Sequence, residues 1–160
     1  MLNAPQTLAR DGIAQRIPHQ GTMCLLDAVQ AWDEESIRCE ASSHRAADNP
    51  LRAYGRLGAA CGIEYAAQAM AVHGALVAES AGAGAAAAPR AGYLAGVRGV
   101  TLHVDRIDTA TGPLTVLAQR ITGDANTVLY SFSVQAGTQA LLSGRAIVVL
   151  DAAQLGKDSR

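Results

Sequence analysis

Alternating hydrophobic and polar residues predict β-strands through the second half of the chain. In the segment VLYSFSV (128–134), every second residue is a large hydrophobic one, so one face of this strand is expected to be apolar and the other mixed. Segments containing Gly, Pro, Asn or Asp interrupt the pattern at intervals, as turns do. The pattern therefore predicts four strands, at about 94–108, 114–123, 127–136 and 140–150.

The first half predicts two strands followed by a long helix. The strands are expected at 24–32 and 36–44, on either side of the acidic turn 33–35. Segment 58–79 contains no proline, consists mostly of strong helix formers, and has hydrophobic residues all round the helix, which is typical of a buried helix. The low-complexity segment 81–90, rich in Ala and Gly, is expected to end it.

This order of elements predicts an α+β fold in which a curved antiparallel sheet of about six strands packs against one long central helix. We expect a single domain over residues 1–150 and a C-terminal tail at 151–160. One helix cannot cover the edges and the outer face of such a sheet. Two copies are therefore expected to pair edge to edge or face to face.

Composition excludes several classes of protein. The formal net charge is −1 and aromatic residues make up 4% of the 160 residues, so neither nucleic-acid binding nor attraction to anionic lipid is expected. The three cysteines form no C-x-x-C pair, which argues against a zinc site or a disulfide framework and favours reduced thiols. No apolar run resembles a signal peptide or a membrane span, so we expect a cytoplasmic protein.

Three motifs follow one another in a fixed order. They are IPHQGTMCLLD (17–27), GIEYAAQA (62–69) and GYLAGV (92–97). In order and spacing they resemble the Pro-His opening, the Glu-x-x-x-Gln helix and the (Tyr/Phe)-Leu-(Ala/Gly)-Gly strand of the 3-hydroxyacyl-acyl-carrier-protein dehydratases. Within that family the chain is most similar to the dehydratase-like branch of aryl polyene and other specialised lipid pathways.

The resemblance implies a hotdog fold, usually a dimer with its active sites at the interface. It also implies the elimination of water from a 3-hydroxyacyl thioester to give a trans-2-enoyl thioester, without a metal or other cofactor. The acyl group is carried on the phosphopantetheine of an acyl carrier protein or on coenzyme A. The expected partners are therefore an acyl carrier protein and a second hotdog subunit, which makes a homodimer, a higher oligomer or a heterodimer with a related subunit.

Dehydration needs a base for the C2 proton, an acid for the departing C3 hydroxyl, and donors that polarise the thioester carbonyl. Glu64 is the first candidate, as the acid. It lies in a nearly uncharged helix, where an ionised carboxylate is costly unless it is paired. Gln68 follows one helical turn later, where it can orient Glu64 or bind substrate.

The base is where the sequence departs from the family pattern. The family places its catalytic histidine 14 residues before the acid, and here that position is Pro50, next to Asn49. The usual base is therefore missing or replaced. Two histidines are candidates to replace it: His19 in the Pro-His motif, and His44 at the end of the second predicted strand.

Other residues point to substrate binding. The Asn49 amide can donate a hydrogen bond or hold a water molecule but cannot remove a proton. Gly58 and the Ala59 amide precede Glu64 and are candidates for polarising the carbonyl. Two other functions stay open on these residues: a hotdog acyl-thioesterase that uses a Glu-activated water, and a catalytically degenerate subunit that binds acyl carriers.

Four arginines are candidates for contacts with an acidic carrier at the mouth of the site: Arg45, Arg52, Arg56 and Arg98. The remaining histidines, His73 and His103, are interpreted as structural.

Overall fold

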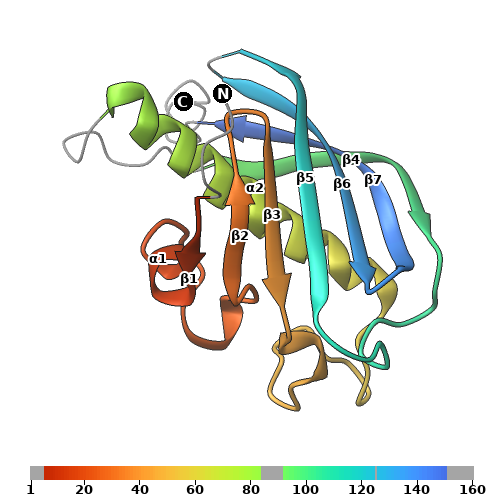
Figure 1. Cartoon of the computed structure of the whole chain (residues 1–160). Helices are drawn as coiled ribbons and strands as arrows, with labels where there is room; N and C mark the ends of the chain where they lie inside the picture. The colour runs from red at the N-terminus through yellow and green to blue at the C-terminus, as the bar shows by residue number, and fades with distance from the viewer. Residues whose placement is uncertain (1–5, 84–91, 125, 151–160) are drawn as a thin grey trace, which may run out of the picture.

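The computed structural model describes residues 6–83, 92–124 and 126–150, which form one sheet with one long helix against it (Figure 1). The strands are β1 (Leu8–Ala9), β2 (Ala28–Trp32), β3 (Ser36–Ala41), β4 (Gly92–Leu102), β5 (Leu114–Gly123), β6 (Thr127–Ala136) and β7 (Gln139–Leu150). The helices are α1 (Arg10–Ala14) and α2 (Gly62–Ala78). Three 3-10 turns, η1 (Gly21–Met23), η2 (Ser43–Arg45) and η3 (Ala59–Cys61), and a π-helical turn, η4 (Glu79–Ala83), complete the list.

Within the described residues the sheet has seven antiparallel strands in the order β1-β2-β3-β5-β6-β7-β4. In Figure 1, α2 crosses behind the strands, and the short β1 lies at the edge opposite β4. The predicted α+β architecture is confirmed, and the strands predicted at 114–123 and 127–136 coincide with β5 and β6. The seventh strand, β1, and the helix α1 were not predicted, because two and five residues are too few to show periodicity.

Three predicted strands are shorter in the structure. The one expected at 36–44 ends at Ala41, because the chain turns into η2 at Ser43. The one expected at 24–32 starts only at Ala28, since the buried Leu25 directs its backbone N–H to a side chain of α2 and not to a neighbouring strand. The one expected at 94–108 ends at Leu102. Beyond that point the chain turns towards the start of α2, where the Ile107 N–H donates to the carbonyl of Leu57 at 2.9 Å.

The core lies between α2 and the inner face of the sheet. The alternation predicted for β6 is confirmed, because Val128, Tyr130, Phe132 and Val134 are all buried. The prediction that α2 is buried all round is wrong for the described chain. One side of the helix packs on the sheet, and the other side, including Ile63, is only half-buried.

Exposed hydrophobic side chains mark the β4 edge of the sheet. Tyr93, Val97 and Leu102 of β4 are 45%, 38% and 48% exposed. Because β4 pairs on one side only, with β7, its other side carries unpaired backbone groups. This edge has the character of a surface that another strand can cover.

Cys24 and Cys39 are buried free thiols, and Cys61 is a half-buried one. Among the described residues, no helix is both long enough and apolar enough to cross a membrane. The predicted tail at 151–160 and most of the predicted connection at 81–90 lie outside the described residues.

Candidate active site

The structure brings His19 and Glu64 together. The Nε2 atom of His19 lies 3.1 Å from Oε1 of Glu64, which is hydrogen-bonding distance. Glu64 comes from the first turn of α2, and His19 from the segment between α1 and β2. The two motifs that the sequence analysis singled out separately therefore form one site.

Gln68 fixes the relative position of these two residues. Its side chain is fully buried, and its amide nitrogen donates to the Met23 carbonyl at 2.8 Å, while its oxygen accepts the Leu25 N–H at 2.9 Å. The segment that carries His19 is thereby fastened to α2 one turn beyond Glu64. The same amide nitrogen lies 3.5 Å from Glu64 Oε1, a weak contact. With both ends of its amide engaged, Gln68 holds the site together, and the structure gives no support to the prediction that it binds substrate.

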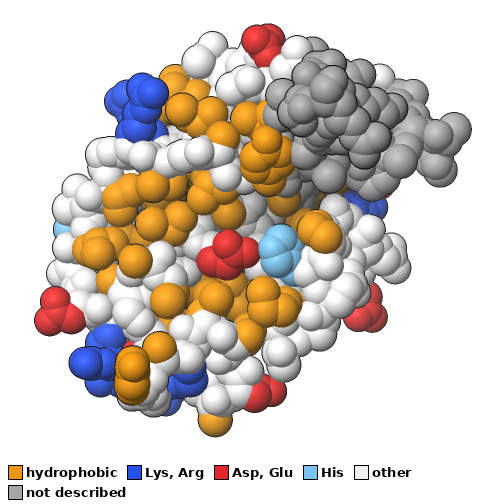
Figure 2. Space-filling view, turned by 180° about the vertical axis from the view of Figure 1, so that it is seen from behind, with side chains coloured by type: hydrophobic (Ala, Val, Ile, Leu, Met, Phe, Trp, Pro, Cys, Tyr) orange, Lys and Arg blue, Asp and Glu red, His pale blue; other side chains and the backbone are white. Residues whose placement is uncertain are grey.

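The sequence context of Glu64 predicted an enclosed side chain. In the structure Glu64 is half-buried, with a side chain 35% exposed. On the side of the molecule that carries α2, hydrophobic side chains gather around an acidic and a histidine side chain that lie side by side (Figure 2). Near the pair in sequence, Ile63 on α2 is half-exposed and Met23 is 39% exposed. The carboxylate is therefore reachable from an apolar surface, as an acyl thioester would require.

The second nitrogen of His19 has no partner. Nδ1 is buried and makes no hydrogen bond within the described residues, although the side chain as a whole is 27% exposed. A buried polar atom without a partner is uncommon. The imidazole thus has Nε2 on Glu64 and Nδ1 buried, so Nε2 is the nitrogen placed for proton transfer.

The side chain of Asn49 is engaged in hydrogen bonds within the protein. It is buried, and its amide nitrogen donates to the Ser43 carbonyl at 2.9 Å and to the Tyr65 hydroxyl at 3.0 Å. Its oxygen accepts the Leu51 N–H at 2.8 Å. Since every polar atom of the side chain is engaged within the protein, the structure does not support the predicted role in substrate binding.

Sequence reasoning missed the two hydroxyls of this network. Tyr65 is fully buried, and its hydroxyl lies 2.8 Å from that of Ser43, which also donates to the Leu25 carbonyl. Burial raises the pKa of Tyr65, and the hydrogen bonds from Ser43 and Asn49 partly oppose that rise. The one signal in the sequence was a tyrosine directly after Glu64 in a helix that has no other Phe, Trp or Tyr.

The contacts of the His44 side chain are with residues other than Glu64. It is fully buried, and its Nε2 lies 3.2 Å from the Ala110 carbonyl, while Nδ1 has no partner among the described residues. Burial lowers the pKa of His44, so the neutral ring is favoured. No contact links it to Glu64 in the described residues, so the geometry favours His19 over His44 as the base.

The two candidates for carbonyl polarisation differ. Ala59 is buried, and its N–H donates to the Asp105 carbonyl at 3.0 Å. This amide is therefore engaged within the protein, whereas the prediction required it to be free for a substrate carbonyl. Gly58 is exposed, and nothing lies within 4 Å of where a Cβ would be. Of the four residues predicted to bind substrate, Gly58 alone leaves open space beside the backbone.

Arg52 has a structural role in the loop before α2. Its guanidinium donates to the carbonyls of Ala46, Gly55 and His44 and lies 3.5 Å from an oxygen of Asp108. Arg52 therefore supports the loop, and its guanidinium is engaged there and not free for the predicted contact with a carrier.

His73 is structural as predicted, since it is buried between the Tyr130 hydroxyl and the Asp33 carbonyl, at 2.7 and 2.8 Å.

The site thus offers an acid–base pair within an apolar surface. No group of three or more His, Cys, Asp or Glu side chains that could hold a metal ion occurs in the described ranges. What the geometry supports is proton transfer between a substrate and the His19–Glu64 pair.

The overall fold is similar to that of known hotdog proteins. A dehydratase heterocomplex, ApeI:P from Xenorhabdus doucetiae, matches with a TM-score of 0.76 at 21% identity, over 96% of this chain and 98% of that chain. The thioesterase HI1161 from Haemophilus influenzae matches with a TM-score of 0.58 at 12% identity, over 91% and 92%. At these identities the likeness to the solved structures shows the hotdog fold. A comparison with curated proteins found no match.

A family model gives a more specific result. It describes the ApeP-like family, ApeP dehydratase, and it matches residues 12–156, a range that includes both His19 and Glu64. Because the match spans nearly the whole chain, and the predicted motifs fall inside it, this chain belongs to the ApeP-like dehydratase family.

Proposed function

We propose that this protein eliminates water from 3-hydroxyacyl thioesters, with His19 as the base and Glu64 as the acid. The observation that carries the proposal is the 3.1 Å contact between His19 Nε2 and Glu64 Oε1. C2 and C3 of the substrate are adjacent atoms, so a base and an acid that serve them must lie within a few ångströms of each other. The membership of an ApeP-like dehydratase family supports the same reaction.

The reaction begins with neutral His19 and protonated Glu64. His19 takes the C2 proton while the C3–O bond breaks, and Glu64 gives its proton to the departing hydroxyl, which leaves as water. The products are a trans-2-enoyl thioester, an imidazolium and a carboxylate. Transfer of the proton from His19 to Glu64 across their contact then restores the pair for the next cycle.

The thioester carbonyl needs donors that stabilise the charge developing on its oxygen. The backbone at the exposed Gly58 is the candidate, because a substrate can approach it without meeting a side chain. No side chain is needed for this role, since backbone N–H groups near a helix start are natural anion donors.

A thioesterase is less well supported. Its motivation in the sequence was Asn49 as a group that holds water, and the Asn49 amide is engaged by Ser43, Tyr65 and Leu51. Hotdog proteins described as thioesterases share the fold at low identity, which does not transfer their activity. A degenerate subunit was suggested by the missing histidine, and His19 supplies a histidine at Glu64.

We propose that the protein works as a hotdog assembly, as a homodimer or with a related subunit. The apolar side chains of the β4 edge and the half-exposed side of α2 support this. The similar ApeI:P structure is a heterocomplex. We further propose that the substrate arrives on the phosphopantetheine arm of an acyl carrier protein.

The test is to incubate the purified protein with 3-hydroxyacyl thioesters of pantetheine, coenzyme A and acyl carrier protein. Formation of the conjugated enoyl thioester, followed by absorbance and mass spectrometry, supports the proposal. Release of free thiol without an enoyl product would show a thioesterase instead. Absence of both products with all three carriers would contradict an enzymatic role for the chain alone.

A further inference from the structure

A row of polar side chains crosses the outer face of the sheet, on the side away from α2. Ser131 of β6 lies opposite Arg145 of β7, which in turn lies opposite Arg98 of β4. Both arginines are exposed, whereas the neighbouring Ala146, on the other face of β7, is buried in the core. Two positive charges therefore face the same solvent surface on adjacent strands.

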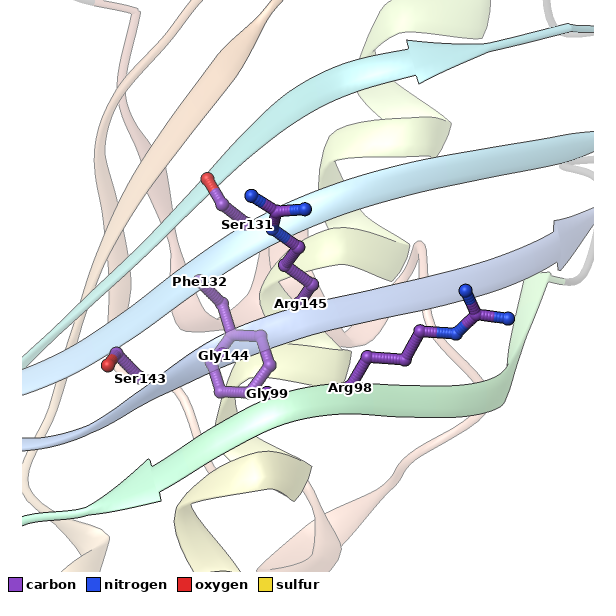
Figure 3. A pocket seen from close by; sticks show the side chains of 7 residues that line it. All are labelled: Arg98, Gly99, Ser131, Phe132, Ser143, Gly144 and Arg145. Carbon is purple, nitrogen blue, oxygen red and sulfur yellow. The ribbon is translucent and has the colours of Figure 1, made fainter.

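This arrangement is unfavourable for the isolated sheet. Like charges directly opposite one another on paired strands destabilise the pairing. Neither Arg98 nor Arg145 has a carboxylate within 4.0 Å among the described residues, while Arg10, Arg16 and Arg106 all do. In Figure 3 the two guanidinium groups point away from each other, as like charges do.

The surface around the two arginines is hollowed. A depression of about 530 Å³ is lined by both arginines, by the hydroxyl-bearing Ser131 and Ser143, by Phe132, and by glycines 99 and 144, which add no side chain. Gly99 has a φ of +58°, a left-handed conformation that favours glycine, at an irregularity in the β4–β7 pairing. Figure 3 shows the side chains of Arg98 and Arg145 beside those of Ser131 and Ser143, which line the same depression.

We propose that this hollow binds a phosphate group, held by Arg98 and Arg145 with hydroxyl donors beside them. Guanidinium groups bind phosphate oxygens in a bidentate manner, and serine hydroxyls add further hydrogen bonds. A bound phosphate group replaces the repulsion between the arginines with attraction and joins the edge strand β4 to β7. The site lies on the opposite face of the sheet from the His19–Glu64 pair, so it does not depend on the proposed reaction.

Isothermal titration calorimetry on the full chain tests this site directly. The probes are inorganic phosphate, coenzyme A and pantetheine without phosphate, all at constant ionic strength. We expect inorganic phosphate to bind with a dissociation constant of roughly 1 mM or below, and Arg98→Gln or Arg145→Gln to weaken it by at least about tenfold. The matched control is Arg38→Gln, since Arg38 is an exposed arginine on the outer face of β3 opposite the uncharged Leu117.

Thermal unfolding gives an independent readout. In chloride buffer, Arg145→Gln should unfold at the same or a higher temperature than the wild type, because one of two repelling charges is gone. Added phosphate should raise the unfolding temperature of the wild type and of Arg38→Gln, but not that of Arg145→Gln.

The coenzyme A arm distinguishes the source of the phosphate. Tighter binding of coenzyme A than of inorganic phosphate, lost in both arginine variants, identifies a phosphorylated organic ligand, whereas equal binding identifies the free ion. Binding of pantetheine alone, no binding of either phosphate compound, or binding that both variants retain would overturn the proposal.

Discussion

Asn49 donates a hydrogen bond to the Tyr65 hydroxyl at 3.0 Å. Asn49 is next to position 50, where the family pattern predicts the catalytic histidine. The sequence predicts that Asn49 binds substrate, but in the structure its amide holds neighbouring groups of the protein. Asn49 holds the loop before α2, and Tyr65 is the neighbour of Glu64 on that helix. The residue at the departure from the pattern therefore holds the loop before α2 to Tyr65.

Replacing Tyr65 with Phe tests this network. The variant removes the hydroxyl that Asn49 and Ser43 share, and leaves part of their buried polar groups without a partner. We expect the free energy of unfolding to fall by about 1–3 kcal/mol, measured by urea denaturation. Tyr54→Phe is the matched control, because Tyr54 is fully exposed, and it should leave stability unchanged. Equal stability of the two variants would argue against a supporting role for the network.

Two glycines of α2 should respond in opposite ways to alanine. A methyl group at Gly62 would overlap the side chain of Leu142, which is buried in β7, whereas nothing lies within 4 Å of the corresponding position at Gly74. We expect Gly62→Ala to destabilise the fold by about 1–3 kcal/mol. Gly74→Ala should stabilise it by about 0.5–1 kcal/mol, because alanine is the better helix former. Thermal unfolding of both variants checks the prediction, and a loss of stability at Gly74 as large as that at Gly62 would contradict it.

Asp108 is expected to govern part of the stability in acid. The Arg106 guanidinium holds the pKa of Asp108 well below the ordinary aspartate value of 3.8, with the Leu57 N–H assisting. Since the folded-state pKa is depressed, the stabilisation is fully present above pH 3.8 and is lost as the pH falls below that value.

The measurement compares the free energy of unfolding of Asp108→Asn with that of the wild type, from neutral pH to below pH 3.8. The variant should be less stable by about 1–3 kcal/mol at neutral pH, because hydrogen bonds to a charged group are lost. The difference between the two proteins should shrink as the pH falls below 3.8. A difference that stays constant down to strong acid would show that the carboxylate charge is not responsible.

The sequence was most informative where hydrophobic periodicity extends over a long element. β5 and β6 have the predicted bounds because their alternation runs over ten residues each and clear turn residues separate them. The start of β2 was placed too early because Leu25 and Leu26 are buried in the core without being part of the strand. Periodicity shows that a residue is buried, but not which element buries it.

The candidate site was likewise predictable only in part. Glu64 and His19 could be named from motifs, but their contact depends on Gln68 binding the backbone at Met23 and Leu25. Interactions between a side chain and a distant backbone leave no periodic signal. This is why Gln68 and Asn49 were predicted to bind substrate, when their polar atoms are engaged within the fold.

The most direct test of the His19–Glu64 pair is the rate of enoyl thioester formation by Glu64→Gln and His19→Gln, with folding of each variant verified by circular dichroism. The matched controls are Glu79→Gln at the far end of α2, which is exposed and paired with Arg16, and His103→Gln, which is exposed after β4. Loss of an acid or base should lower the rate by about 10²–10⁴-fold in each site variant. The two controls should retain the wild-type rate. A Glu64→Gln or His19→Gln variant that dehydrates its substrate as fast as the wild type would contradict the account.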